Sequence, residues 1–359
     1  MRIGIDAREL GGRATGVGRY LRGLLDEWSG SEQARRHEFV LYASESLGVS
    51  LDAHRFPTHI VPGSGGTWWE QVSLPRVAAR DHLDVFFAPA YTAPCFSNMP
   101  TVVAIHDLSF AAHPEWFTMR EGLRRRWLTR RSARRARAVL TISEFSRREI
   151  RERLGVGGER VHVVPPGITP PARSAAAGSA NAPNILFVGS IFNRRHLPDL
   201  IRAFGAIART HPDAALDIVG DNRSFPREDL PRTIDIEAPG GRAHWHRYVT
   251  DDQLSALYGS ARAFAFLSEY EGLGLTPLEA LAAGIPPVLA DTPVARESCG
   301  DAALYVPVGD VAAITRALEH VLFDEATRRT LLAAAPAALA RYSWPAAARE
   351  TLSVIESAA

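Results

Sequence analysis

Length, composition and charge exclude several classes of protein. The 359 residues are enough for two domains with separate cores, and contents of 46% hydrophobic and 23% charged residues are ordinary for a globular chain. No apolar stretch approaches the roughly 18 residues of a membrane-spanning helix, and a net charge of +1 argues against nucleic acid as a partner. Cys95 and Cys299 show no metal-ligand spacing, and the first residues lack the apolar segment of a signal peptide. We therefore expect a cytoplasmic protein with reduced thiols.

Short apolar runs alternate with helix-length segments along the chain. The expected strands are residues 2–7, 39–43, 85–89, 101–105, 139–143, 185–189, 215–220, 263–268, 287–290 and 303–307. The expected helices are residues 18–28, 68–80, 198–210, 251–260, 311–323, 325–341 and 344–357. Strands that alternate with helices indicate parallel sheets with helices on both faces. We therefore expect an α/β fold of two doubly wound, Rossmann-like domains.

A segment of small residues bounded by prolines, residues 170–183, separates the two series of strands and is typical of a linker. The expected organisation is a Rossmann-like domain at 1–172, a linker at 173–183, a second Rossmann-like domain at 184–342 and a final helix at 343–359. Ligands of such sheets bind outside the carboxyl ends of the strands. We therefore expect a site in a central cleft that the two domains face.

Two features of the first half lie at the expected ligand edge of its sheet. Gly16 and Gly18 follow the first strand, where glycine permits close backbone approach and an open helix N-terminus. A simple turn explains this pair equally well. His106 follows the strand at 101–105 and precedes Asp107. A lone histidine at a strand end is more often structural, so the residues alone leave its role open.

Arginines follow the first strand of the second half. Arg194 and Arg195 come after the strand at 185–189, and a helix begins at Pro198. We find no lysine, so all 41 residues of the Lys+Arg count are arginine and any phosphate-binding cation must be arginine or protonated histidine. The planar guanidinium can hold two phosphate oxygens. The turn is a candidate diphosphate clamp, and a solvated basic loop is the alternative.

Residues 268–290 are the most informative stretch of the chain. Glu271 and Glu279 are separated by seven residues, and a glycine loop with Gly272 and Gly274 lies between them. A strand, a glycine loop and a helix in this order aim backbone N–H groups at a phosphate. Carboxylates would repel the phosphate itself, but they accept hydrogen bonds from the hydroxyls of a sugar or a ribose. The stretch therefore predicts a sugar-nucleotide site.

The helix of this stretch has recognisable start and stop signals. Thr276 is the expected N-cap and Pro277 the first helical residue. Gly284 is expected to end the helix in a left-handed conformation. These signals place Glu279 about one turn into the helix.

The stretch resembles the E-x7-E motif of the retaining GT-B glycosyltransferases of family four, in particular their mannosyltransferase-like branch. Further segments that resemble the family are residues 5–8, 69–71, 105–107, 142–146, 165–167, 187–189 and 342–344. They cover nearly the whole chain in the family's order. The resemblance implies the GT-B fold and transfer of a hexose from a nucleoside-diphosphate sugar, with no cofactor. Our first expectation for the donor is GDP-mannose.

The resemblance also implies roles for individual residues. Arg195 stands where the family normally has the lysine that holds the donor diphosphate, with Arg194 beside it. Glu271 would hold sugar hydroxyls, Glu279 the ribose, and His106 would approach the donor sugar, so Arg195, Glu271 and His106 are the expected catalytic residues. The remaining expected donor-binding residues are Gly16, Gly18, Arg194, Val249, Gly272, Leu273, Gly274, Leu275, Thr276 and Glu279.

Two departures and one absence qualify this assignment. Ser190 stands where many members carry another phosphate-binding arginine. Arg247 stands where the family commonly has glycine, and this second departure leaves the identity of the donor's nucleobase undetermined. Asp251 and Asp252 fit a helix cap better than a metal site. We expect no divalent metal.

A cluster of arginines marks residues 120–137, where nine arginines accompany one acidic residue, Glu121. A solvated helix face is the plainest interpretation. Attraction to anionic membrane lipid at the inner face of the membrane and binding of an anionic acceptor are the alternatives.

The sequence thus predicts a retaining glycosyltransferase. Its partners would be a nucleotide-sugar donor and an acceptor that is a lipid-linked saccharide or a small molecule. A sugar-nucleotide epimerase with the same architecture and a non-catalytic nucleotide-sugar-binding protein are the competing hypotheses.

Overall fold

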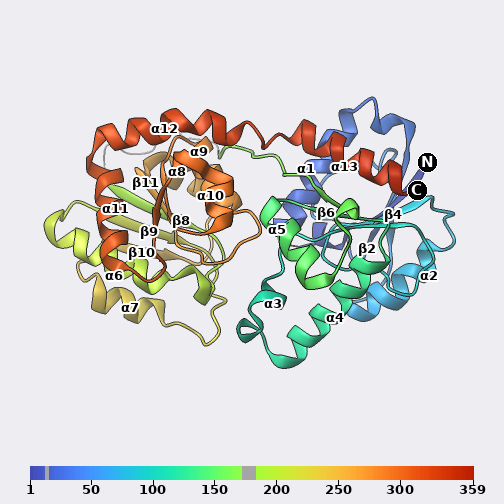
Figure 1. The fold of residues 1–359 in the computed structure, drawn as a ribbon, viewed down its shortest axis with the longest axis horizontal. Coiled ribbons are helices and arrows are strands. Elements are labelled where there is room, and N and C mark those ends of the chain that lie inside the picture. Colours follow the sequence, from blue (N-terminus) through green and yellow to red (C-terminus); the bar gives the residue numbers. More distant parts are fainter. Residues whose placement is uncertain (13–15, 172–182) are drawn as a thin grey trace. The chain divides into compact units, whose positions relative to one another are not determined.

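The computed structural model describes residues 1–12, 16–171 and 183–359. The chain forms two compact units, one made of Met1–Gly167 with Tyr342–Ala359 and the other of Ile168–Arg341 (Figure 1). The expected linker at 173–183 lies outside the described residues except for residue 183. The chain therefore passes from the first unit to the second and returns to the first.

The first unit is built on a parallel sheet with the strand order β3-β2-β1-β4-β5-β6-β7. The strands are β1 (Arg2–Asp6), β2 (Glu38–Ala43), β3 (Thr58–Ile60), β4 (Val85–Ala88), β5 (Thr101–Ala104), β6 (Ala138–Thr141) and β7 (Val161–Val163). The helices are α1 (Gly16–Gly30), α2 (Leu74–Ala78), α3 (Ser109–Ala112), α4 (Met119–Arg135), α5 (Glu144–Glu149) and α13 (Trp344–Ala358).

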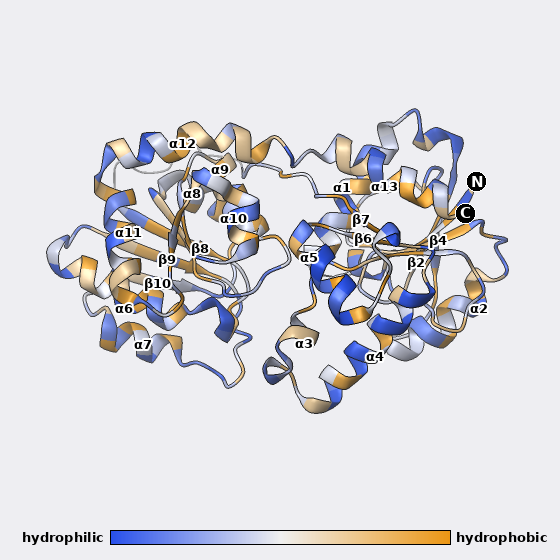
Figure 2. Ribbon diagram, viewed as in Figure 1, coloured by the Kyte–Doolittle hydropathy of each residue, from blue (hydrophilic) through white to orange (hydrophobic). Residues whose placement is uncertain are grey.

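Side chains that alternate along these strands pack into two apolar layers, one on each face of the sheet. Ile3 and Ile5 of β1 pack with α1 and α13 on one face of the sheet. Val40 and Tyr42 of β2 belong to the layer on the other face, with residues of α2 and α4. Burial on both faces explains why the strands are apolar runs rather than alternating patterns (Figure 2).

The final helix α13 completes the first of these layers. The indole Nε1 of Trp28 donates to the carbonyl oxygen of Ala348 at 3.0 Å. Leu352 and Ile355 are fully buried in the same core cluster as α1. Glu356 accepts from Gln33 at 3.1 Å and lies 2.8 Å from the ring Nε2 of His37. The last helix is thus part of the first unit's core.

The second unit repeats the plan with the strand order β10-β9-β8-β11-β12-β13, again parallel. The strands are β8 (Asn184–Val188), β9 (Ala215–Val219), β10 (Ala243–His246), β11 (Ala263–Phe266), β12 (Pro287–Ala290) and β13 (Leu304–Val306). The helices are α6 (Leu197–Thr210), α7 (Leu230–Glu237), α8 (Asp251–Ser260), α9 (Leu275–Ala282), α10 (Pro293–Cys299), α11 (Val311–Phe323) and α12 (Glu325–Leu339).

Each sheet reverses its strand order once, which confirms the predicted doubly wound architecture. The reversal lies between β1 and β4 in the first unit and between β8 and β11 in the second. Loops that leave the carboxyl ends of these strands diverge at such a switch point and form the usual ligand site of an open sheet. The loops after β8 and β11 are the two that carry the arginine turn and the glutamate motif.

The structure corrects two details of the predicted elements. The expected helix at 68–80 is a π-helical turn, Trp69–Ser73, followed by the short α2. Strands β3, β7 and β10 and helices α3, α5, α7 and α10 were not predicted. Within the described residues, no helix combines the length and the apolar character needed to cross a bilayer.

Candidate functional site

Glycine shapes the end of β8. Gly189 has a φ of +148°, and a Cβ atom at this position would lie 2.5 Å from an Nη atom of Arg195. The same guanidinium donates to the carbonyl oxygen of Ser190 at 2.6 Å. It also lies 4.7 Å from the ring centroid of Phe266, at the end of β11. Glycine therefore gives the arginine the space to fold back over the strand end.

Arg195 and Glu271 form an ion pair. The Nε and one Nη of Arg195 donate to Oε1 of Glu271 at 3.0 and 2.8 Å, and the hydroxyl of Ser268 donates to the same oxygen at 2.9 Å. The side chains of Arg195 and Glu271 are 12% and 18% exposed. The structure thus brings together two of the three predicted catalytic residues, and Ser268 is a partner that the sequence did not reveal.

Arg194 ties the same two loops together. Its Nε donates to the carbonyl oxygen of Tyr270 at 3.2 Å, and its own carbonyl oxygen accepts from the backbone N–H of Glu269 at 3.0 Å. Its guanidinium lies 4.4 Å from the ring centroid of Phe192. The loops after β8 and β11 are therefore one connected structure at the switch point.

The glycine loop leads into α9, but the predicted N-cap is wrong. Gly274 occupies the N-cap with a φ of +87°, and the helix begins at Leu275, so Thr276 is the second helical residue. A left-handed N-cap favours glycine over threonine. The first turn of a helix leaves backbone N–H groups without intrahelical partners, and here they belong to Leu275 and Thr276 because Pro277 has none.

The predicted end of α9 is confirmed. Gly284 has a φ of +75°. Its N–H donates to the carbonyl oxygen of Leu281, and the N–H of Ile285 donates to that of Ala280, both at 2.9 Å. This is a Schellman cap. Glu279 lies on this firmly closed helix one turn after its start and is partly exposed, while Gly272 and Leu273 in the loop are buried.

The turn before α8 carries Val249, one of the expected donor-binding residues. Thr250 caps α8 in a capping box with Gln253, and Asp251 and Asp252 lie in the first turn of the helix. Val249, the preceding residue, is partly exposed. Arg247 is 69% exposed and lies 3.5 Å from a carboxylate oxygen of Asp221. An arginine in place of glycine therefore adds a large, solvated cation near this turn.

His106 lies two residues after β5 in the first unit. Its Nε2 donates to the carbonyl oxygen of Pro89 at 2.8 Å, and it packs edge-on against Tyr20 and Tyr91. Burial lowers its pKa below the usual value. Tyr91 has a φ of +65°, uncommon for a residue with a side chain, and its hydroxyl donates to Asp107 at 2.8 Å. The ring is therefore held in one tautomer and one orientation.

The two glycines after β1 are not in a loop. Gly16 and Gly18 are the first and third residues of α1, which starts earlier than predicted. Among the described residues, a Cβ atom on Gly16 would have no neighbour within 4 Å, so close packing against them does not require glycine at this position.

A buried ionic network at the end of β1 was not predicted from residue chemistry. Arg8 donates to Oδ2 of Asp6 at 2.9 and 2.5 Å, to Oδ1 of Asp6 at 3.1 Å and to Glu70 at 3.2 Å. Burial raises the pKa of Glu70, although Arg8 opposes the shift. Gln71 donates to Glu70 at 3.0 Å. In the sequence these residues stand out only as parts of segments that resemble the family, and charged residues at a strand end are the one chemical signal of the network.

Two doubly wound parallel units, with an arginine turn and a glutamate motif at the switch point of the second, are the architecture of a GT-B glycosyltransferase. A family model described as Glycosyltransferase Family 4 matches residues 14–170, and one described as Glycosyl transferases group 1 matches residues 173–337. The chain belongs to this family of glycosyltransferases.

Individual relatives and solved structures agree with this assignment. The O-antigen chain mannosyltransferase B of Escherichia coli is 26% identical over 291 residues, which are 77% of this chain and 75% of that protein. Sucrose-phosphate synthase of Thermosynechococcus elongatus has a TM-score of 0.80 at 18% identity, over 99% of this chain and 98% of the other. Anabaena Alr3699/HepE, solved in complex with UDP and glucose, has a TM-score of 0.78 at 19% identity, over 99% and 100%. The structural matches show the fold.

Proposed function

We propose that this chain is a retaining glycosyltransferase that transfers a hexose from a nucleoside-diphosphate sugar to an acceptor hydroxyl. The observation that carries the proposal is the Arg195–Glu271 pair at the switch point of the second sheet. It combines a cation for the leaving diphosphate with a carboxylate for sugar hydroxyls, beside a glycine loop and a helix start.

Each side chain has a distinct role in the proposed reaction. The bond between the anomeric carbon and the diphosphate oxygen breaks as the acceptor oxygen attacks from the same face, and the diphosphate takes the acceptor's proton. Arg195 and Arg194 stabilise the charge that develops on the diphosphate, which is usually the largest catalytic contribution. Glu271 accepts hydrogen bonds from the sugar and Glu279 from the ribose.

Binding of the donor would change the partner of Arg195. In this structure, Glu271 neutralises the guanidinium through a single carboxylate oxygen. A diphosphate offers more charge and a matching geometry for the guanidinium. Arg195 would then turn toward phosphate, and Glu271 would be released to bind the sugar. The pair thus holds both groups close to their working positions.

His106 would approach the donor sugar as a neutral group. Its Nε2 is already committed to Pro89, so Nδ1 is the nitrogen left to accept a hydrogen bond. Because burial lowers its pKa, the ring stays uncharged at neutral pH. We assign it no role as a general base. Gly16, Gly18 and Val249 remain proposed donor contacts.

Mannose from GDP-mannose is the proposed donor group, supported by the relative that is an O-antigen mannosyltransferase. The proposed acceptor is a lipid-linked saccharide or a small molecule, and no cofactor is proposed. A sugar-nucleotide epimerase and a non-catalytic binding protein are the competing functions.

Calorimetry with GDP- and UDP-sugars, followed by product analysis with and without acceptor, tests the proposal. We expect micromolar binding of one donor and turnover only when an acceptor is present. Conversion of the donor without any acceptor would instead identify an epimerase. Tight binding without turnover of any donor across an acceptor panel would identify a binding protein.

A further inference from the structure

Helix α4 presents an apolar stripe on its outer side. Met119, Leu123 and Trp127 follow one another at intervals of four residues, which places them on one side of the helix. Their exposed fractions are 82%, 54% and 54%. Leu128 and Ala133, on the inner side, are buried. Packing on the sheet therefore does not account for the stripe.

Arginines border this stripe on both edges. The sequence of α4 contains eight arginines and one acidic residue, Glu121. At about 100° per residue, Arg120, Arg124 and Arg131 project along one edge of the stripe and Arg126 along the other, while Arg130 projects on the same side as the stripe, one turn after Arg126. Among the described residues, Arg125 is the α4 arginine that pairs with a carboxylate, that of Glu121 at 2.7 Å. The outer side of α4 therefore carries a large positive charge that the described carboxylates of the unit do not balance.

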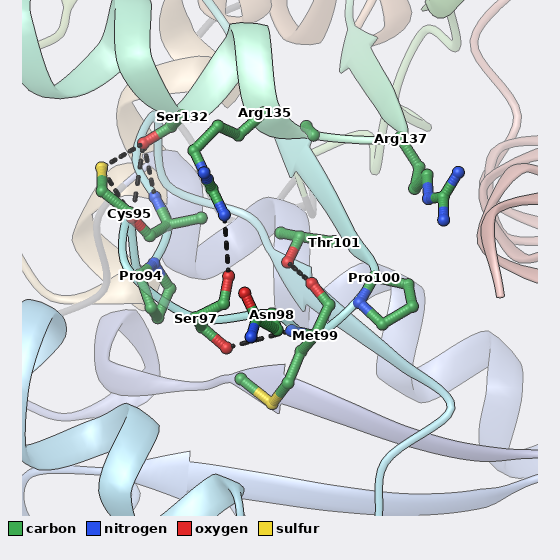
Figure 3. A pocket seen from close by; sticks show the side chains of 12 residues that line it. Pro94, Cys95, Ser97, Asn98, Met99, Pro100, Thr101, Ser132, Arg135 and Arg137 are labelled. Carbon is green, nitrogen blue, oxygen red and sulfur yellow. Dashed lines mark hydrogen bonds between the residues drawn. The ribbon is translucent and has the colours of Figure 1, made fainter.

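A neighbouring loop adds another aromatic ring to the same side. Phe96 is 69% exposed, and the guanidinium of Arg131 lies 4.8 Å from its ring centroid and 5.8 Å from that of Trp127. The loop is fastened to α4 beside a pocket of about 160 Å³ (Figure 3). There Arg135 donates to the carbonyl oxygen of Ser97 at 3.2 Å. Phe96, Arg131 and Trp127 thus form one fixed cluster.

We define the α4 face as Phe96, Met119, Leu123 and Trp127 with the arginines that border them. Tryptophan favours the boundary between lipid headgroups and acyl chains, and arginine binds the phosphates of anionic lipids. A water-soluble polyanion would match the arginines but would leave the apolar stripe in water. We propose that the α4 face docks on the surface of an anionic phospholipid bilayer, with the stripe among the headgroups and the arginines on the phosphates.

This surface activity is separate from glycosyl transfer. It requires no donor and uses none of the residues placed at the switch point of the second sheet. Vesicle binding and nucleotide binding therefore report on different parts of the molecule. A negative result in the vesicle assay therefore does not contradict the proposed glycosyl transfer, and a negative result in the nucleotide assay does not contradict membrane docking.

Co-sedimentation of the full chain with vesicles tests the proposal. Vesicles of phosphatidylcholine with about 30 mol% phosphatidylglycerol should bind the protein at about 50 mM salt, and binding should weaken as salt rises. Vesicles of phosphatidylcholine alone should bind it far less. No binding to the anionic vesicles at low salt would overturn the proposal.

Two variants separate the contributions of charge and apolar contact. Changing Arg120, Arg126 and Arg130 together to Gln should lower the partition coefficient about 100-fold, since each arginine near an anionic surface contributes about fivefold. Changing Leu123 and Trp127 together to Ala should lower it by on the order of tenfold or more, because their apolar area no longer inserts. Unchanged circular dichroism and nucleotide affinity would show that both variants are folded.

Matched control variants carry the same changes elsewhere on the exposed surface. Arg209, Arg329 and Arg349 changed together to Gln remove the same charge, and Ile236 and Phe323 changed to Ala remove exposed apolar groups. Both controls should bind vesicles like the wild type. Losses as large in the controls as in the α4 variants would overturn the proposal. The proposal would also be overturned if the protein bound a soluble anionic polysaccharide through the same arginines but did not bind vesicles. In that case the α4 face would be a glycan-binding surface.

Discussion

Both sheets place an arginine beside a carboxylate at their switch points, but the two arginines are held in different ways. In the first unit, Arg8 lies between Asp6 and Glu70, whose side chains are 1% and 5% exposed. In the second unit, Arg195 pairs with Glu271, and this glutamate is 18% exposed. The first arrangement holds one arginine between two buried carboxylates, whereas the pair in the second unit lies nearer the surface.

The difference suggests how one arrangement serves structure and the other serves ligand binding. A phosphate that approached Arg8 would compete with two buried carboxylates for which Arg8 is the cation that the described residues supply. A phosphate that approached Arg195 would displace one carboxylate, which could then bind a neutral hydroxyl. We infer that Arg8 stabilises the first unit and that Arg195 binds the leaving group. The predictions below test this division of roles.

The largest effect on stability is expected at Arg8. Arg8→Ala leaves two buried carboxylates unpaired and should lower the free energy of unfolding by about 3–5 kcal/mol, measured by urea denaturation. Arg22→Ala, which breaks an exposed pair with Asp26, is the control and should cost no more than about 0.5 kcal/mol. The loss at Arg8 should shrink at acidic pH, because the carboxylates can then take up protons. A loss at Arg8 no greater than at Arg22 would contradict the structural role.

A comparable effect, but on catalysis, is expected at Arg195. Arg195→Ala should lower kcat by about 10²–10³, with little change in the urea midpoint because a less buried carboxylate is left behind. Arg195→Lys should recover much of the activity, since it restores a cation at the diphosphate. Arg202→Ala, on the exposed side of α6, should behave like the wild type. If the alanine variant keeps wild-type kcat at saturating donor, Arg195 is not the diphosphate clamp.

A smaller effect is expected at Glu279. Glu279→Ala removes a charged acceptor for the ribose hydroxyls, and charged hydrogen bonds contribute roughly 1.5–3 kcal/mol. Affinity for the nucleoside diphosphate should therefore fall about 10- to 100-fold, measured by calorimetry. Glu350→Ala, on the exposed side of α13, serves as the control. Unchanged affinity in a folded Glu279 variant would remove this residue from the site.

The smallest effect is expected from metal removal. If Arg195, Arg194 and the start of α9 meet the charge of the diphosphate, activity should survive excess EDTA. The assay compares initial rates with and without the chelator. Activity that disappears with EDTA and returns with Mg²⁺ would show that the arginine turn does not act alone.

The sequence predicted the architecture well because both sheets are buried on two faces. Such strands are continuous apolar runs, and β1, β8 and β12 lie within a residue of their predicted bounds. The unpredicted strands β3, β7 and β10 are only three or four residues long and contain histidine. Their extended conformation depends on pairing with neighbouring strands, and a local sequence pattern does not show this pairing.

The candidate site was predictable in outline but not in its contacts. Parallel strands end at one edge, so the loops with Arg195 and Glu271 had to lie near each other. Their ion pair, however, joins residues 76 positions apart and depends on side-chain conformation and on Ser268. The N-cap at Gly274 was missed because threonine is a common cap and the left-handed backbone is visible only in three dimensions. The Arg8 network was missed because a sequence does not reveal burial.

The place of α13 in the first unit has a consequence for synthesis on the ribosome. The second unit, Ile168–Arg341, is a continuous segment that can fold as soon as it emerges. The first unit begins the chain, yet the apolar side of α1 that packs against α13 stays uncovered until residues 344–358 follow. The unit that is translated first is therefore the last to close. Throughout that interval the nascent chain exposes a surface that a chaperone, or another copy of the last helix, can occupy.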